Sequence, residues 1–162
     1  MTTLSHKPTE RWCPRVTVAA VIQDDLGRYL LVEEAPRGTR VLNQPAGHLE
    51  PGESLQEAVI REVREETCMA FSPTGVVGVY QWQVAPDGPS YLRFCFSGTA
   101  TPLDDCRRDP DILALHWLSS DVLAGGQWRL RSPMVMQCIE DAERGDCYPL
   151  ASLHAMGIGS HD

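Results

Sequence analysis

The segment that most constrains this chain is 47-GHLEPGESLQEAVIREVREETCM-69, which combines a helical pattern with an excess of acid. A helix is expected from about Ser54 to Thr67, with Glu53 and Ser54 at its N-terminal cap. One face of this helix begins with an apolar stripe formed by Leu55, Ala58 and Val59. With roughly 100° between successive residues, the same face continues as three carboxylates, Glu62, Glu65 and Glu66.

These three glutamates occupy positions where further core residues would be expected. A solvated charged face is the ordinary explanation for acids on a helix, but these acids share their direction with the apolar stripe. Carboxylates about 5–6 Å apart repel by about 3 kcal/mol per pair at an effective dielectric of 20. A divalent cation offsets this repulsion, and Mg²⁺ is the usual ion where phosphates supply further ligands, with Mn²⁺ as a substitute. A purely structural acidic helix is the alternative, and it predicts no metal-dependent thermal shift.

The residues around the acids suit the same purpose. Gly47 and Gly52 allow tight backbone turns ahead of the helix. Arg61 lies four residues after Glu57 and four before Glu65, so it can hold the helix flank and steer a carboxylate. A simple surface ion pair explains the Arg61 spacing equally well, and Glu53 can equally be an acid that complements the helix dipole.

Charge and composition exclude several classes of function. The net charge of −8 argues against nucleic-acid binding through a basic surface. Six Glu against two Arg give residues 47–69 a charge of −4, half of the total. The chain has no apolar run of about 20 residues and no signal-peptide pattern at its start, so we expect a cytoplasmic protein without a membrane segment. The six cysteines form no CxxC pair and are expected to be reduced and mostly packed.

The rest of the chain predicts a single compact α/β layered domain. Residues 1–13 are expected to be a polar tail, 14–150 the domain and 151–162 an irregular tail. The expected strands are 15–23 and 29–35, paired as a hairpin, a short extended piece at 41–47, and then 75–84, 90–100 and 111–119. A short helix at 120–124 and a last helix from Ser132-Pro133 to Gly145 follow, and residues 147–162 are expected to be irregular.

The acidic segment resembles the signature of the Nudix hydrolases. Gly47, five residues, Glu53, seven residues and then 61-REVREE-66 reproduce the spacing of that family's box. One position departs from it, because Cys68 stands where the family has a late glycine. Cysteine can serve there if its φ stays negative, so we expect the change to affect loop geometry more than metal binding.

This resemblance implies a fold, an activity and a set of site residues. The fold would be the Nudix α/β/α sandwich, a mixed β-sheet between helices with the box as loop–helix–loop. The activity would be hydrolysis of a diphosphate linked to another moiety. The implied ligands of Mg²⁺ are the carboxylates of Glu62, Glu65 and Glu66 together with the Gly47 carbonyl. Arg61 would orient Glu62, and Glu53 would lie in the outer shell. The base stays open among the carboxylates, with Glu62 preferred, and Asp111 is a candidate extra acid that an ordinary loop position explains better.

A closer similarity links the chain to one subgroup of that family, the NudJ phosphatases. It rests on the stretches 43–50, 81–96 and 130–150 and extends over about residues 14–150. Members of this subgroup release orthophosphate from thiamine diphosphate, from its hydroxymethylpyrimidine diphosphate precursor and from nucleoside di- and triphosphates. The box itself does not indicate which bond is broken, so this expectation depends on the wider similarity.

Several residues outside the box are candidates for binding such a substrate. Trp82, Tyr80 and Tyr91 could stack on a flat ring, although aromatic residues on strands more often belong to the core. Arg93 could meet a phosphate or simply point outward, and Arg131, with Arg129, precedes the last helix where anions often bind. Gln44, which lies in the 43–50 stretch, is a further candidate for substrate binding.

Other functions remain possible at this level. A Nudix pyrophosphohydrolase acting on ADP-ribose, dinucleoside polyphosphates or oxidised nucleotides would use the same box. A ligand-binding module without turnover is a second alternative, which the intact Arg61, Glu62, Glu65 and Glu66 disfavour. The expected partner is a small diphosphate, with no nucleic acid or membrane, and the protein is expected to be a monomer or a weak homodimer.

Overall fold

The computed structural model describes residues 12–158, so almost all of the predicted tail at 1–13 lies outside the described residues. The strands are β1 (Arg15–Ile22), β2 (Tyr29–Glu34), β3 (Val41–Asn43), β4 (Ala46–His48), β5 (Met69–Gln83), β6 (Ser90–Pro102) and β7 (Ile112–Leu118). The α-helices are α1 (Leu55–Thr67), α2 (Ser120–Ala124) and α3 (Met134–Glu143). Two short 3₁₀ turns are η1 (Pro36–Gly38) and η2 (Leu150–Ser152). No helix in this part of the chain is long and apolar enough to cross a membrane.

The strands form two sheets. One has the order β4-β1-β6-β5 and is mixed, because β1 and β6 are parallel while the other pairs are antiparallel. The other has the order β3-β2-β7 and is antiparallel. The predicted hairpin of residues 15–35 is therefore wrong, since β1 and β2 lie in different sheets and share only the bridge Gln23–Tyr29. All eight residues of β1 pair with β6, and this long-range ladder replaces the local pairing suggested by the turn between the strands.

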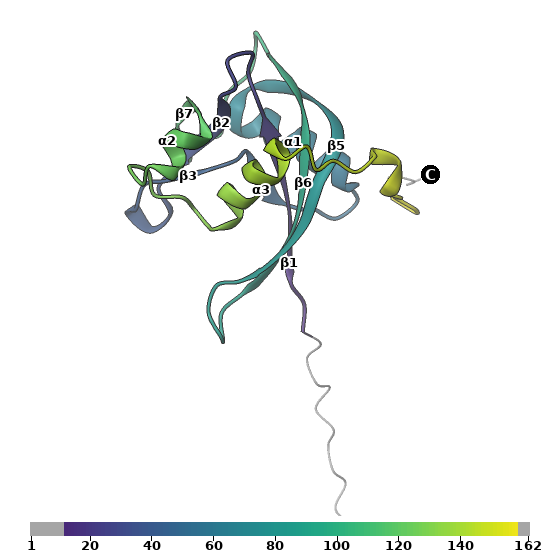
Figure 1. Ribbon diagram of the computed structural model, residues 1–162. Coiled ribbons are helices and arrows are strands. Elements are labelled where there is room, and N and C mark those ends of the chain that lie inside the picture. The colour runs from purple at the N-terminus through teal and green to yellow at the C-terminus, as the bar shows by residue number, and fades with distance from the viewer. Residues whose placement is uncertain (1–11, 159–162) are drawn as a thin grey trace, which may run out of the picture.

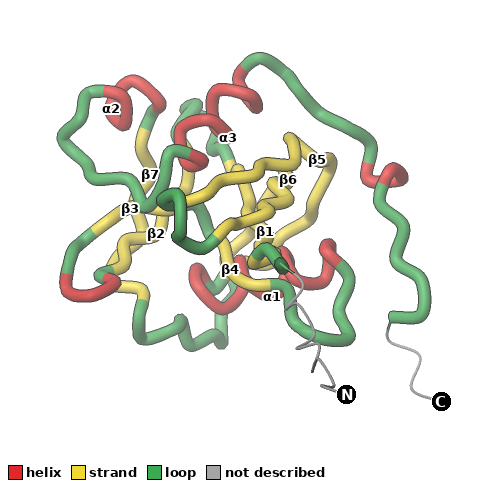
Figure 2. Tube along the Cα trace, turned by 90° about the horizontal axis from the view of Figure 1, so that it is seen from below, coloured by secondary structure: helices red, strands yellow, loops and turns green. Residues whose placement is uncertain are grey.

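Helices cover both faces of the four-stranded sheet, with α1 on one side and α3 on the other (Figures 1 and 2). Successive residues of β1 alternate between the two cores. Val18, Ala20 and Ile22 pack with the α1 residues Ala58, Val59 and Val63. Ala19 and Val21 pack with the α3 residues Val135, Cys138 and Ile139. The predicted α/β/α class is confirmed, with two sheets in place of the single expected one.

The longest feature is the β5–β6 hairpin, which runs well past the body of the molecule in Figure 1. β5 begins at Met69, six residues before the predicted start at 75. The strand passes Pro73 and Gly75 with register shifts at Pro73/Gly75 and Val76/Gly78. Such bulges let a strand continue past a proline.

The segment after α3 is more ordered than predicted. Gly145 follows the helix with φ of 82°, as expected for a C-terminal glycine. The backbones of Tyr148 and Val76 then exchange two hydrogen bonds of 2.7 and 2.8 Å. Leu150 and Leu153 pack against the core beneath α1. The expectation of an irregular segment from residue 147 is therefore wrong for its first part.

Candidate active site

The box helix begins as the sequence predicts. Ser54 caps α1, accepting from the Glu57 amide at 3.2 Å, while the Glu57 carboxylate accepts from the Ser54 amide at 2.7 Å. Such a capping box satisfies amides that the first turn leaves without partners. Glu57 is thereby committed to the cap and forms no ion pair with Arg61, contrary to the spacing argument.

Arg61 joins the box loop to the box helix. Its Nε and Nη2 donate to both oxygens of Glu53 at 2.9 and 2.7 Å, a bidentate pair. Its Nη1 donates to Glu62 at 2.8 Å and to Glu65 at 3.2 Å, and its Nη2 also reaches the His48 carbonyl at 3.0 Å. Since the Arg61 side chain is only 23% exposed, it is not a simple surface ion pair. These hydrogen bonds from Arg61 lower the pKa of Glu53 and keep its carboxylate charged.

Gly47 lies directly against Glu62. A Cβ built at Gly47 would come within 2.0 Å of the Glu62 Oε1 atom, so a larger residue here would displace this carboxylate. β4 holds Gly47 there through its antiparallel pairing with Val18 of β1. The Gly47 backbone and the Glu62 carboxylate therefore share one small region.

Glu66 is the most enclosed of the three acids. The Ala46 amide donates to it at 2.9 Å, and no cation pairs with it among the described residues. Burial raises the pKa of the Glu66 carboxyl to about 8, and the nearby charges of Glu62, Glu34 and Asp109 add to this shift. Burial also raises the pKa of Glu62, although Arg61 opposes the shift.

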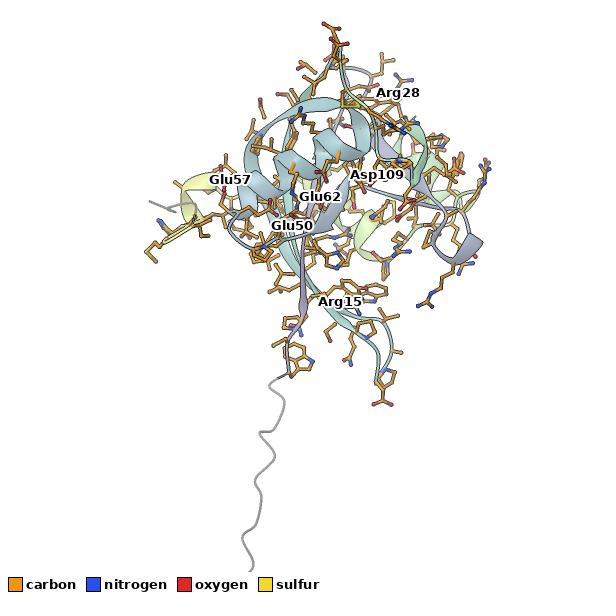
Figure 3. The ribbon with its side chains drawn as sticks, turned by 180° about the vertical axis from the view of Figure 1, so that it is seen from behind. Arg15, Arg28, Glu50, Glu57, Glu62 and Asp109 are labelled. Carbon is orange, nitrogen blue, oxygen red and sulfur yellow. A yellow bond between two sulfur atoms is a disulfide. The ribbon has the colours of Figure 1, made fainter. Side chains whose placement is uncertain are left out.

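The third acid, Glu65, lies at the rim, with 53% of its side chain exposed. It borders a cavity of about 520 Å³ between α1 and the loop that carries Asp105, Cys106 and Arg107. The three predicted ligands thus run from the interior to the surface along one edge of the helix. Figure 3 shows Glu62 on α1, with Asp109 on the neighbouring loop.

These residues fit a magnesium ion. No three His, Cys, Asp or Glu side chains within residues 12–158 already meet as a closed ligand cage. Mg²⁺ does not need such a cage, because it commonly uses one or two carboxylates and takes waters and substrate phosphates as its other ligands. Glu62 and Glu66 are two desolvated carboxylates beside the Gly47 backbone, and a cation there would offset the charge that burial disfavours.

The departure at Cys68 has a structural explanation that the sequence did not suggest. Cys68 ends α1 in the left-handed conformation, with φ of 56°, so the condition of a negative φ is not met. It forms a disulfide with Cys106, so the expectation of reduced cysteines is wrong for this pair, whereas Cys95 and Cys138 are buried free thiols. The disulfide joins the loop after β6, which carries Cys106, to the C-terminal end of the box helix.

In that loop, the acid near the box is not the candidate Asp111, for which an ordinary loop position was the preferred interpretation. The Asp109 amide donates to the Glu65 carbonyl at 2.8 Å, and the charge of Asp109 acts on Glu66. Asp111 is exposed, and its amide donates to the Asp109 carboxylate at 2.9 Å. Asp109, rather than Asp111, is therefore the loop acid near the box.

The predicted substrate residues fall into separate groups. Trp82 and Tyr91 stack on the β5–β6 hairpin, with ring centroids 6.0 Å apart. Arg93 is buried and donates to the Gln44 side chain at 3.2 Å, so it does not point outward. Arg131 lies apart from them and pairs with Glu34 at 3.5 Å.

Two residues of this region, Glu34 and Thr17, were not predicted from the sequence. Glu34 ends β2 at a register shift between Glu33 and Glu34, and its charge acts on Glu66. The neighbouring Glu33 is occupied elsewhere, because it contacts His116 and Arg40, each at 2.8 Å. Thr17 is buried on β1 beside Arg93. Two adjacent acids at the end of an apolar strand were the available signal for Glu34, and Thr17 gave none.

Comparisons with known proteins agree with this geometry. The model of the NUDIX domain matches residues 14–137. The Phosphatase NudJ of Escherichia coli strain K12 is 39% identical over 138 residues, which cover 85% of this chain and 88% of that protein. A NUDIX hydrolase structure from Nitrosomonas europaea matches with a TM-score of 0.84 and 51% identity, covering 89% of this chain and 98% of that chain.

A more distant structure shows the same fold alone. The NUDIX domain of Shewanella oneidensis NrtR, solved with ADP ribose, matches with a TM-score of 0.66 at 21% identity and covers 87% of this chain and 94% of that chain. The family model spans most of the chain, and the NudJ phosphatase covers most of it at well over 30% identity. The chain therefore belongs to the Nudix hydrolase family.

Proposed function

We propose that the protein is a Mg²⁺-dependent phosphatase that releases orthophosphate from the end of a diphosphate or triphosphate chain. The expected substrates are thiamine diphosphate, hydroxymethylpyrimidine diphosphate and nucleoside di- and triphosphates. The observation that carries the proposal is the pair of desolvated carboxylates, Glu62 and Glu66, beside the Gly47 backbone. Orthophosphate as product is supported by the similarity to the NudJ phosphatases.

The residues of this chain divide the work of the reaction. Bound Mg²⁺ would neutralise phosphate oxygens and lower the pKa of water. Glu62, Glu65 and Glu66, with the Gly47 carbonyl, are the groups that would hold it. Arg61 fixes Glu62 by donating to its Oε1, which leaves Oε2 to accept a proton from the attacking water. The water oxygen bonds to the terminal phosphorus, and the bridging oxygen leaves with the shortened substrate.

Other residues would hold the substrate. Trp82 and Tyr91 offer a flat apolar surface for a heteroaromatic ring. Arg131, which precedes α3 and lies 3.5 Å from Glu34, offers a guanidinium for a phosphate group. Glu53 acts through Arg61 and is a positioning residue.

The test is an assay that separates the products. Purified protein is incubated with thiamine diphosphate, CTP and ADP-ribose, with Mg²⁺ or with EDTA, and orthophosphate, pyrophosphate and AMP are quantified separately. The proposal expects Mg²⁺-dependent orthophosphate from the first two substrates. It also expects a loss of at least 100-fold in Glu62→Gln and Glu66→Gln, with no loss in the control Glu140→Gln on the exposed side of α3.

Other products would identify a different enzyme. Pyrophosphate from CTP, or AMP from ADP-ribose alone, would retain the Nudix site and refute the phosphatase activity. No product from any substrate, together with Mg²⁺-independent binding of one of them, would indicate a binding module.

A further inference from the structure

A row of polar side chains crosses the α3 face of the four-stranded sheet. Tyr80 of β5 and Thr17 of β1 both pair directly with Arg93 of β6. Directly paired residues point to the same face of a sheet, so these three side chains lie next to one another. Arg93 is 5% exposed and Thr17 is 6% exposed. Two residues further along the same strands, Cys95 and Ala19 belong to the apolar core beneath α3.

Arg93 is a buried cation whose hydrogen-bonding capacity is only partly used. Its Nη1 donates to the Gln44 Oε1 atom at 3.2 Å, but its Nε has no partner. Within residues 12–158 no carboxylate forms an ion pair with it, and the nearby thiols of Cys95 and Cys138 are weak acceptors. The neighbouring Thr17 Oγ1 atom is also buried without a partner. Buried donors in this state favour a bound acceptor that completes them.

An aromatic platform lies beside this row, toward the tip of the hairpin. Tyr91 pairs with Trp82 on β5 and with Arg15 on β1, two residues from the Arg93 row on each strand. The Trp82 and Tyr91 rings lie 24° from parallel. Arg15 donates to the Tyr91 hydroxyl at 3.3 Å and lies over its ring at 5.8 Å. Two residues along a strand span about 7 Å, the width of a heteroaromatic ring.

The row is also connected to the carboxylates. The Gln44 side chain is fixed at both ends, because its Nε2 donates to the Val135 carbonyl at 2.8 Å. Two residues later, the Ala46 amide holds Glu66. Thr17 pairs with His48, the neighbour of Gly47. β4 is the edge strand of this sheet, so its backbone lies beside both the row on the α3 side and the carboxylates on the α1 side.

We propose that Arg93 and Thr17 form a subsite that binds the hydrogen-bond-acceptor edge of a heteroaromatic ring seated on Trp82 and Tyr91. The inference rests on the proposed function and names the substrate class, a diphosphate or triphosphate ester of a ring with a carbonyl oxygen or ring nitrogen at its edge. It moves Arg93 from the phosphate chain, its expected partner from sequence, to the ring. Phosphate recognition then falls to the metal and Arg131.

The test separates recognition of the ring from recognition of phosphate. KM and kcat are measured for CTP or thiamine diphosphate, whichever the wild type hydrolyses faster, and Ki is measured for tripolyphosphate, which has no ring. Arg93→Met is expected to raise KM at least tenfold with kcat within threefold and Ki unchanged. Thr17→Val, which preserves the side-chain shape, is expected to raise KM at least threefold. Arg28→Met is the control, because Arg28 pairs with Asp24 in the β1–β2 turn.

Each other outcome overturns the proposal. An equal rise in KM and in Ki would place Arg93 on the phosphate chain, and no change in either would make it structural. If Arg93→Met does not fold, as judged by circular dichroism, Thr17→Val and Arg93→Lys decide the question by the same criteria.

The proposed function and this subsite can fail separately. If the wild type hydrolyses no substrate, the proposed function fails, and the subsite is tested by titrating CMP into the protein in EDTA. Binding weakened at least tenfold by Arg93→Met supports the subsite. Equal binding by both proteins, or no binding by the wild type, overturns it.

Discussion

Replacing Glu66 by Gln should change how the stability of the metal-free protein depends on pH. The Glu66 carboxylate is buried and accepts one hydrogen bond, from the Ala46 amide, which a glutamine oxygen can also accept. Its pKa rises from 4.5 to about 8 in the folded protein. Between these values the native state keeps a proton that the unfolded chain has lost. The free energy of unfolding therefore falls as the pH rises through this window.

The size of the effect follows from the shift. A difference of 8 − 4.5 pKa units corresponds to a loss on the order of 5 kcal/mol between pH 4.5 and pH 8. Glutamine has no charge to bury, so Glu66→Gln should be several kcal/mol more stable than the wild type at pH 8.5 in EDTA and nearly equal at pH 5. Mg²⁺ should reverse the order, because it binds and stabilises the charged wild type.

Urea unfolding followed by tryptophan fluorescence measures this effect at pH 5.0 and 8.5, with EDTA or Mg²⁺. The lowered pKa of Glu53 acts in a different window, since the stability it contributes is lost only as the pH falls below its ordinary value. Glu140→Gln controls for the loss of a surface charge. A variant less stable than the wild type at pH 8.5 in EDTA would refute the reasoning, as would equal stability at that pH.

Three further changes test the rest of the site. Gly47→Ala should lower kcat at least 100-fold, because the added methyl group displaces the Glu62 carboxylate; unchanged orthophosphate release would contradict this geometry. Arg61→Lys should lower kcat at least tenfold and leave KM within threefold, since lysine cannot form the bidentate pair with Glu53; equal changes in both constants would point to substrate binding instead. Cys106→Ser opens a 38-residue loop and should cost about 4 kcal/mol in urea unfolding under oxidising conditions; a reductant should remove this difference, and a difference that persists would mean the disulfide does not stabilise the protein.

The sequence alone predicted the elements whose signals are local. Ser54 and the residues after it contain both the cap and the amphipathic pattern, and α1 begins and ends where these indicate. The short helix and the end of the last helix before Gly145 were also predicted from local signals, and Ser119 caps the short helix. The start of α3 differs from the prediction, because Pro133 is its N-cap and no side chain caps it, so Ser132 is not a cap. The spacing of the box glutamates also fixed which side of the helix carries the acids, because a helix converts spacing into direction.

Tertiary structure decided what depends on distant partners. β1 does not pair with β2, its neighbour in the sequence, because eight residues of β6, far along the chain, pair with it. Cys68 adopts a left-handed backbone, and it forms a disulfide with Cys106, which lies 38 residues later in the chain. Glu34 and Asp109 approach Glu66 from two other segments, which no local pattern could indicate. Local spacing determines which side chains share a face, but only packing determines which faces meet, because contact between distant segments depends on the burial available to the whole chain.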